Sequence, residues 1–226
     1  MQGFRRYAVY WAPSGGAWAK AAAEWLGWDP VAGRAAMQPD MGVPLADWTE
    51  EPRKYGFHGT VKAPFRLAEG WDQARLCAST ETVFARLGPI QLQGLSLHRI
   101  GSFLALTPDG DVSALTALAA EVVMGLDAAR APLTPAEIQR RRPERLSPLQ
   151  RGLLDRWGYP YVLGEFQFHL TLSGSLRPAD LDRIQPLAEA HFAPHVPRPF
   201  QITDLCLFAE AEDGRFHLLS RHALTG

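Results

Sequence analysis

Cysteines and long apolar runs are scarce in this 226-residue sequence. Cys77 and Cys206 are the only cysteines, and they lie far from any C-x-x-C spacing. This scarcity excludes a disulfide scaffold and favours a reducing, cytoplasmic compartment in which both thiols are small core residues. No apolar run approaches the ~20 residues that cross a bilayer, so we expect no membrane partner.

An excess of charge is also absent. The 23 basic and 24 acidic residues leave a net charge of −1, which disfavours a general binder of polyanions. No G-x-G-x-x-G or G-K-[ST] phosphate loop follows a predicted strand, so a nucleotide-cofactor fold has no support. The composition, 46% hydrophobic and 21% charged, is that of a globular protein large enough to fold without disulfides or a metal.

Hydrophobic periodicity predicts two similar series of elements. The first series is a strand near 56–66, a helix near 71–87, and strands near 90–99 and 102–107. The second is a strand near 165–173, a helix near 178–192, and strands near 199–209 and 215–221. A strand near 7–12 and a helix near 17–28 precede both series, and helical segments near 113–130 and 135–157, the latter interrupted at Pro143, lie between them.

The two series align at nearly one displacement. His58 and His169 occupy equivalent strand positions 111 residues apart, and both following strands slip phase, at Gly94 and Asp204, as a β-bulge would require. We therefore predict an internal duplication, with pseudo-repeats about 56–107 and 166–221, in a single domain over residues 1–226. Helices mixed with hairpin-connected strands predict an α+β fold with two antiparallel sheets.

Each repeat carries the pattern H-x-T on a strand. Because side chains alternate between faces, His58, Thr60 and Lys62 should share one face, as should His169 and Thr171. A single copy is best explained as a half-buried structural histidine. Two copies at equivalent points of a repeat favour a functional site, and a pseudo-two-fold axis would bring both pairs to one cleft.

Two imidazoles and two hydroxyls suit the cleavage of a phosphodiester without a metal ion. A neutral imidazole can take a proton from an attacking water, and a protonated one can give a proton to the leaving alkoxide. Threonine hydroxyls can donate hydrogen bonds to the oxygens on which transition-state charge develops. The repeat alone does not decide which histidine is the acid and which the base.

These motifs resemble those of the two-histidine (2H) phosphoesterases, which include RNA 2′,3′-cyclic phosphodiesterases and 2′-5′ RNA ligase-like proteins. Three longer strings are similar to the DUF1045 branch, whose members are often linked to phosphonate utilisation: Arg53-Lys54-Tyr55-Gly56-Phe57-His58-Gly59-Thr60-Val61-Lys62-Ala63-Pro64-Phe65, Gly158-Tyr159-Pro160-Tyr161-Val162 and Phe166-Gln167-Phe168-His169-Leu170-Thr171-Leu172. The similarity extends over nearly the whole chain. Gly59 departs from the alanine frequent at this position of the branch, a change that keeps the site face intact.

The resemblance implies a bilobal fold with outer helices and a central cleft. It implies His58 and His169 as acid and base, Thr60 and Thr171 as phosphate-oxygen donors, and no metal or cofactor. The link to phosphonates suggests a small cyclic ribose phosphate, such as 5-phosphoribosyl 1,2-cyclic phosphate, as the substrate. Two alternatives stay open: an RNA-end 2′,3′-cyclic phosphodiesterase or 2′-5′ ligase-like enzyme, and a non-catalytic binder of phosphonucleotides or RNA ends.

Further cationic and aromatic residues are candidates for binding the substrate phosphate. Lys62, one of three lysines against twenty arginines, is either a phosphate ligand or a solvated strand end, and Tyr55 is expected at the mouth of the cleft. Residues 139–156 contain six arginines and two acids. They predict the polar face of a helix or, alternatively, an anchor for a second phosphate. Tyr159 and Tyr161 predict a turn packed by two aromatic rings or, alternatively, rings that stack on a sugar or a base.

Overall fold

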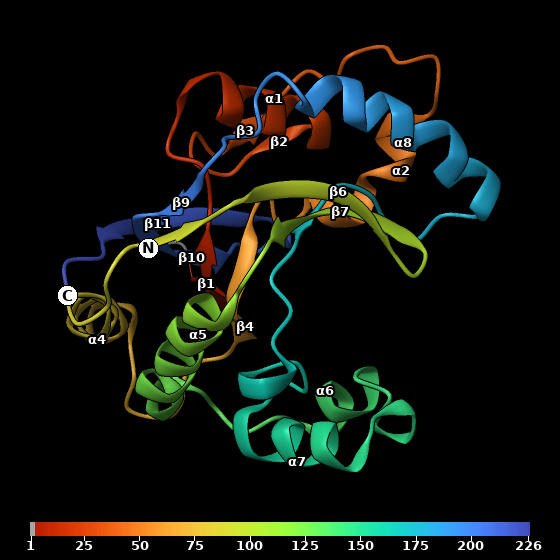
Figure 1. Cartoon of the computed structure of the whole chain (residues 1–226). Helices are drawn as coiled ribbons and strands as arrows, with labels where there is room; N and C mark the ends of the chain where they lie inside the picture. Colours follow the sequence, from red (N-terminus) through yellow and green to blue (C-terminus); the bar gives the residue numbers. More distant parts are fainter. Residues whose placement is uncertain (1–2) are drawn as a thin grey trace.

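The computed structural model describes residues 3–226, so Met1 and Gln2 of the predicted domain lie outside it. Its main element is a fully antiparallel seven-stranded sheet in the order β11-β10-β1-β4-β8-β7-β6 (Figure 1). These strands are β1 (Arg6–Trp11), β4 (Gly59–Phe65), β6 (Gly94–Ile100), β7 (Phe103–Asp109), β8 (Leu170–Thr171), β10 (Asp204–Glu210) and β11 (Phe216–Ala223). The predicted α+β fold with antiparallel sheets is confirmed.

Two small sheets accompany the main one. They pair β5 (Ile90–Leu92) with β9 (Phe200–Ile202), and β2 (Trp28–Asp29) with β3 (Arg34–Ala35). The predicted bulges at Gly94 and Asp204 are strand breaks instead: β5 and β9 pair with each other, whereas β6 and β10 join the large sheet. The apolar phase slips there because the chain passes from one sheet to the other.

Helices cover the sheet in separate groups (Figure 1). The α-helices are α1 (Gly16–Leu26), α2 (Leu45–Trp48), α3 (Glu50–Arg53), α4 (Gln73–Phe84), α5 (Ser113–Gly125), α6 (Pro135–Arg140), α7 (Pro148–Trp157) and α8 (Pro178–Phe192). Short 3₁₀ turns are η1 (Asp127–Ala129), η2 (Pro143–Arg145) and η3 (Leu163–Glu165). In Figure 1, α1, α2 and α8 lie above the sheet, α4 and α5 at its lower left, and α6 and α7 apart at the lower right. None of the helices within residues 3–226 is both long and apolar enough to span a membrane.

The strand–helix–strand–strand–strand order occurs twice, as β4-α4-β5-β6-β7 and β8-α8-β9-β10-β11. Equivalent residues of the two series pair with each other, Gly59 with Leu170 and Gln91 with Gln201. Antiparallel pairing of equivalent residues is what a local two-fold axis between the series produces. The strands of both halves join in one sheet rather than two: β4 pairs with β8 at Gly59–Leu170, and β8 pairs in turn with β7 at Ala105–Thr171 and Leu106–Leu170.

The core fills the space between the sheet and the helices. Its largest fully buried side chains include Trp25 of α1, Phe84 of α4, Phe192 of α8 and Phe200 of β9. Of the two free cysteines, Cys206 is buried and Cys77 is half-buried.

The segment of α6 and α7 is defined by local signals. Each helix begins with a capping box, Thr134 with Glu137 and Ser147 with Gln150, and each has proline in its first turn. Arg142, at φ 50°, separates the two helices immediately before Pro143. These signals end one helix and start the next, so the predicted helical stretch 135–157 divides into α6, η2 and α7.

Candidate active site

The first H-x-T pair lies at the start of β4. The Nδ1 atom of His58 is 2.8 Å from the carbonyl oxygen of Gly56, and its Nε2 atom is 3.1 Å from the hydroxyl of Thr60. A carbonyl can only accept, so Nδ1 carries the proton in the neutral ring and Nε2 accepts from the Thr60 hydroxyl. This tautomer leaves the basic nitrogen of His58 on the side of Thr60.

The second H-x-T pair lies at β8, a strand of two residues. The Nδ1 atom of His169 is 2.9 Å from the carbonyl oxygen of Gln167, which repeats the arrangement of His58 and Gly56. Because β8 is so short, neighbouring elements hold the chain that follows it: the indole of Trp25 donates to the carbonyl of Leu172 at 2.8 Å, and the amide of Leu172 donates to the carbonyl of Leu104 at 2.8 Å.

The pairing of β4 with β8 brings the two motifs together. Gly59 is opposite Leu170, so the antiparallel register, continued by one residue each way, places His58 opposite Thr171 and Thr60 opposite His169. Residues directly opposite on one face have Cβ atoms ~4.5–5.5 Å apart. The pairing therefore puts the two H-x-T motifs side by side on adjacent strands. Of this group of four residues, His58, Thr60 and Thr171 line one cavity, and His169 lines another.

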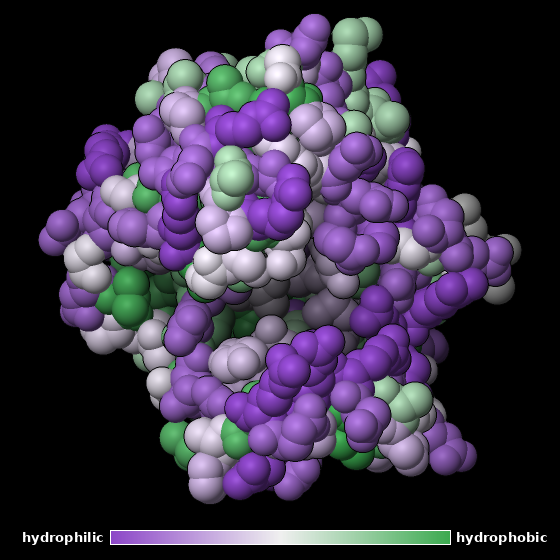
Figure 2. All heavy atoms as spheres, turned by 90° about the vertical axis from the view of Figure 1, so that its right-hand side faces the viewer, coloured by the Kyte–Doolittle hydropathy of each residue, from purple (hydrophilic) through white to green (hydrophobic). Residues whose placement is uncertain are grey.

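A cavity of about 530 Å³ adjoins this group. His58, Thr60, Thr171 and Tyr55 line it, as Tyr55 was predicted to do. Figure 2 shows the molecule hollowed between its upper part and a strongly hydrophilic lower part. The volume suits a small molecule rather than a polymer.

The surroundings of His58 keep its ring neutral. The ring of Tyr10, on β1, lies 3.9 Å from that of His58 between centroids, and the ring of Tyr55 lies 5.8 Å away. Burial lowers the pKa of His58 to about 4, the charge of His169 lowers it too, and the hydrogen bond to Gly56 opposes both. At neutral pH His58 is thus a base with an unprotonated Nε2.

His169 has different neighbours. It lines a smaller hollow of about 280 Å³ beside Thr107 of β7 and the start of α5, and its ring lies 5.7 Å from that of Phe103 between centroids. Thr171, two residues further along β8, lines the larger cavity. The two histidines therefore line different hollows, His58 the larger and His169 the smaller.

Lys62 does not share the face of His58 and Thr60. The pairing of β1 with β4 shifts register twice, so that Thr60 is opposite Tyr10 while Lys62 is opposite Val9. Tyr10 lines the cavity, whereas Val9 belongs to the hydrophobic core. An extra residue in one strand reverses the alternation of faces. The predicted placement of Lys62 in the cleft is therefore wrong.

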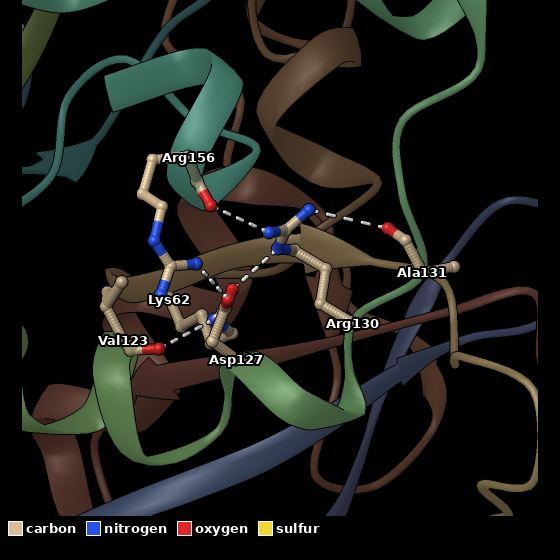
Figure 3. Close-up of polar contacts among 6 residues, drawn as sticks. All are labelled: Lys62, Val123, Asp127, Arg130, Ala131 and Arg156. Carbon is tan, nitrogen blue, oxygen red and sulfur yellow. Dashed lines mark hydrogen bonds and ion pairs between the residues drawn. The ribbon is translucent and has the colours of Figure 1, made fainter. Parts of the chain in front are cut away.

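Lys62 lies instead in a buried polar cluster (Figure 3). Its side chain is buried, its Nζ atom donates to the carbonyl of Val123 at 3.0 Å, and Asp127 is 4.0 Å away. Burial lowers the pKa of Lys62 to about 8, Asp127 raises it, and Arg130 lowers it further. Asp127 also accepts from Arg130 at 2.8 Å and from Arg156 at 3.0 Å. The cluster thus connects β4 to η1 and α7.

The arginines of segment 139–156 lie in different surroundings. Arg140 and Arg141, at the end of α6, line the large cavity, whereas Arg156 belongs to the cluster of Asp127. Tyr159 also lines the cavity. The ring of Tyr161 packs edge-on against the ring of Tyr159, and Tyr161 is 42% exposed.

Sequence reasoning missed Tyr10 and Arg6 as cavity residues. Their strand, β1, precedes the first repeat and carries no motif of its own. Only the pairing of β1 with β4 brings Tyr10 and Arg6 to the cavity, and no local sequence pattern predicts that pairing.

The described residues offer no cluster for a metal ion. Within residues 3–226 no three His, Cys, Asp or Glu side chains come close enough together to hold one. His191 is four residues from His195, but its Nε2 atom bonds to the carbonyl of Ala21 at 2.9 Å.

Solved structures with similar folds include two bacterial proteins. Escherichia coli LigT complexed with 3′-AMP superposes with a TM-score of 0.49 at 14% identity, covering 99% of this chain and 100% of that one. TT0787 of Thermus thermophilus gives a TM-score of 0.45 at 16% identity, covering 98% of each chain.

Two curated relatives are both named ribose 1,5-bisphosphate phosphokinase PhnN. The one from Janthinobacterium sp. (strain Marseille) is 38% identical over 218 residues, 92% of this chain and 48% of the relative. The one from Laribacter hongkongensis (strain HLHK9) is 34% identical over 219 residues, 96% of this chain and 51% of the relative. The chain spans about half the length of these relatives.

A protein family matches most of the site-bearing region. Residues 60–217 fit the family described as "Protein of unknown function (DUF1045)". This range includes three of the four H-x-T residues, Thr60, His169 and Thr171, and begins two residues after His58. The chain belongs to the DUF1045 family.

Proposed function

We propose that the protein is a metal-independent phosphodiesterase that opens a small cyclic phosphodiester. The observation that carries this proposal is the group of four side chains formed by the pairing of Gly59 with Leu170. A phosphate over that pair would have His58 and Thr171 on one side and Thr60 and His169 on the other. Two imidazoles and two hydroxyls beside a cavity are the groups that acid–base cleavage of a phosphodiester needs.

The histidines divide the chemistry according to their surroundings. His58, neutral because burial lowers the pKa of its ring, takes a proton from the attacking water through Nε2. The water oxygen forms a bond to phosphorus, and the bond from phosphorus to the ribose oxygen breaks. His169 gives the Nε2 proton to that oxygen, which leaves as a hydroxyl, and the product is a phosphomonoester.

The threonines bind the phosphate oxygens. The Thr60 hydroxyl, which donates to His58 in the free protein, turns to a non-bridging oxygen when the substrate is bound. The Thr171 hydroxyl does the same from the opposite strand. Such donors stabilise the charge that grows in the transition state.

A pentose with a 1,2-cyclic phosphate and a 5-phosphate is the substrate we propose. Cleavage at its 2-oxygen adds one water and yields ribose 1,5-bisphosphate, the sugar phosphate in the printed name of both relatives. We do not transfer the kinase activity in that name, because it belongs to proteins twice as long and this sequence contains no G-K-[ST] phosphate loop.

A turnover assay tests the proposal. The protein is incubated in EDTA with 5-phosphoribosyl 1,2-cyclic phosphate or with nucleoside 2′,3′-cyclic phosphates, and the products are identified by phosphorus NMR. We expect EDTA-insensitive conversion to ribose 1,5-bisphosphate. His195→Gln is the matched control, because this histidine lines neither hollow.

Three results would overturn parts of the proposal. Preference for nucleoside 2′,3′-cyclic phosphates would make the protein an RNA-end enzyme. Saturable binding without turnover of any cyclic phosphate would make it a binder. Ribose 2,5-bisphosphate as the product would move the cleaved bond to the 1-oxygen.

A further inference from the structure

Residues outside the two H-x-T motifs also line the large cavity. Arg140, the last residue of α6, Arg141, which follows it, and Tyr159 are among them, and the guanidinium carbon of Arg141 lies 4.8 Å from the centre of the Tyr159 ring. These three residues come from the segment between the two repeats, not from either repeat.

Both arginines lack acidic partners. Across residues 3–226, no ion pair or side-chain hydrogen bond involves Arg140 or Arg141, although ion pairs engage the other cavity-lining charges. Glu137 accepts from Arg66 at 2.9 Å, Glu51 from Lys54 at 2.7 Å, and Arg6 pairs with Glu210. The cavity therefore has two positive charges that the protein does not neutralise.

Tyr10 supplies an independent observation. Its side chain is 0% exposed and lines the cavity, yet its hydroxyl has no hydrogen-bond partner within the part of the chain that the structure describes. A buried hydroxyl without a partner is costly, and it is commonly satisfied by a ligand or by water. Burial raises the pKa of Tyr10, Tyr55 and Tyr159 raise it further, and Arg6 lowers it.

The chemistry of these groups fits a phosphomonoester. Two guanidinium groups match its charge of about −2 and its oxygen geometry, and phenol hydroxyls donate to the remaining oxygens. Tyr10, whose ring lies 3.9 Å from that of His58 between centroids, lines the same cavity as Arg140 and Arg141. One ligand with two phosphates in this cavity can therefore contact both the H-x-T residues and the arginines.

We propose that Arg140, Arg141 and Tyr10 form a second anion subsite, which binds a phosphomonoester of the substrate while His58, Thr60, His169 and Thr171 act on its cyclic diester. This inference rests on the proposed function, because it assigns another part of the same substrate. It makes α6 the element that selects phosphorylated over unphosphorylated sugars.

Two substrates that differ only in the second phosphate test the subsite. The assay compares kcat/KM for 5-phosphoribosyl 1,2-cyclic phosphate and for ribosyl 1,2-cyclic phosphate. For the wild type we expect a preference of about 100-fold or more for the phosphorylated sugar, since charge-assisted hydrogen bonds to arginine are strong. Arg140→Ala/Arg141→Ala should reduce that ratio by roughly tenfold or more, mainly through KM. Arg145→Ala, an exposed arginine of the same segment that does not line the cavity, is the control.

A binding measurement separates this inference from the proposed function. Ribose 5-phosphate, which has no diester, should bind the wild type, bind Tyr10→Phe less tightly, and bind the double arginine variant least. Tyr10→Phe keeps the ring beside His58 and removes a hydroxyl that has no partner among the described residues, so its thermal stability should not fall. Equal binding by all variants, or equal turnover of both sugars by the wild type, would overturn the subsite. Binding as expected without any turnover would overturn the proposed function alone.

Discussion

The two H-x-T strands carry the same motif in different surroundings. β4 has seven residues and pairs on both edges, and its His58 lies beside Tyr10 with a pKa lowered to about 4. β8 has two residues, and its His169 lines a separate, smaller hollow. The comparison shows that equivalent positions in a repeat become chemically different through the neighbours that each strand acquires. β1, which has no counterpart in the repeat, places Tyr10 beside His58 alone.

Replacing either histidine should have the largest effect. His58→Gln and His169→Gln should each lower kcat by about 10²–10⁴-fold, the usual contribution of a general acid or base. The pH profile of kcat/KM distinguishes the two variants. Loss of the base in His58→Gln should remove the acid limb of the profile, and loss of the acid in His169→Gln should remove the alkaline limb. Identical residual profiles for the two variants would contradict the division of roles.

Replacing the threonines should have a smaller effect. Thr60→Val and Thr171→Val should each lower kcat by about 10²–10³-fold, as the loss of one oxyanion donor does. Only Thr60 donates to His58, so only Thr60→Val should also raise the pKa of the acid limb. Steady-state rates between about pH 4 and pH 8 measure both effects. An equal shift in both variants would show that the two strands are more alike than their contacts indicate.

Gly59→Ala changes the junction between the strands. A Cβ atom at this position would lie 2.2 Å from the ring of Phe168, the residue before His169. The ring cannot move without disturbing its packing, so we expect a loss of about 1–3 kcal/mol of unfolding free energy, the usual cost of overpacking. Urea unfolding measures it, with Gly164→Ala, where a Cβ atom meets nothing within 4 Å, as the control. An unchanged midpoint would mean that the junction can open.

The pH dependence of stability tests the surroundings of His58 without any substrate. The ring of His58 has an ordinary pKa near 6.5 in the unfolded chain and about 4 in the folded protein. Between these values the unfolded chain binds more protons, so the contribution of His58 to stability falls as pH falls from 6.5 to about 4. His58→Gln should therefore show a shallower loss of stability than the wild type in that interval, measured by urea unfolding. Parallel curves would contradict the lowered pKa.

The elements of the fold and the place of the H-x-T motifs at strands could be predicted because both depend on local patterns. The alternation around Thr60 and Thr171 locates the strands, and the spacing of the motifs matches the two element series of the structure. The family was also recognised from these strings, and it is confirmed. The duplication itself stays a prediction, with which the pairing of equivalent residues agrees.

What could not be predicted depends on pairing between distant strands. The placement of Lys62 was wrong because two register shifts against β1 intervene, and alternation within β4 cannot reveal them. The joining of both halves into one sheet depends on the pairing of β8 with β4 on one edge and with β7 on the other. Tyr10 and Arg6 reach the cavity only through the same pairing of β1 with β4.

The hydrogen bonds from Nδ1 to main-chain carbonyls have a consequence for how the site tolerates mutation. Every residue type has a main-chain carbonyl. The tautomer of each histidine therefore depends on the backbone conformation two residues earlier and not on a partner side chain. At Gln167, which is exposed, most substitutions leave that carbonyl where it is. Gly56 is different, since its φ of 71° and the nearby ring of Pro30 require glycine. A saturation scan of the two carbonyl-bearing positions should thus find one nearly silent and the other restricted to a single residue.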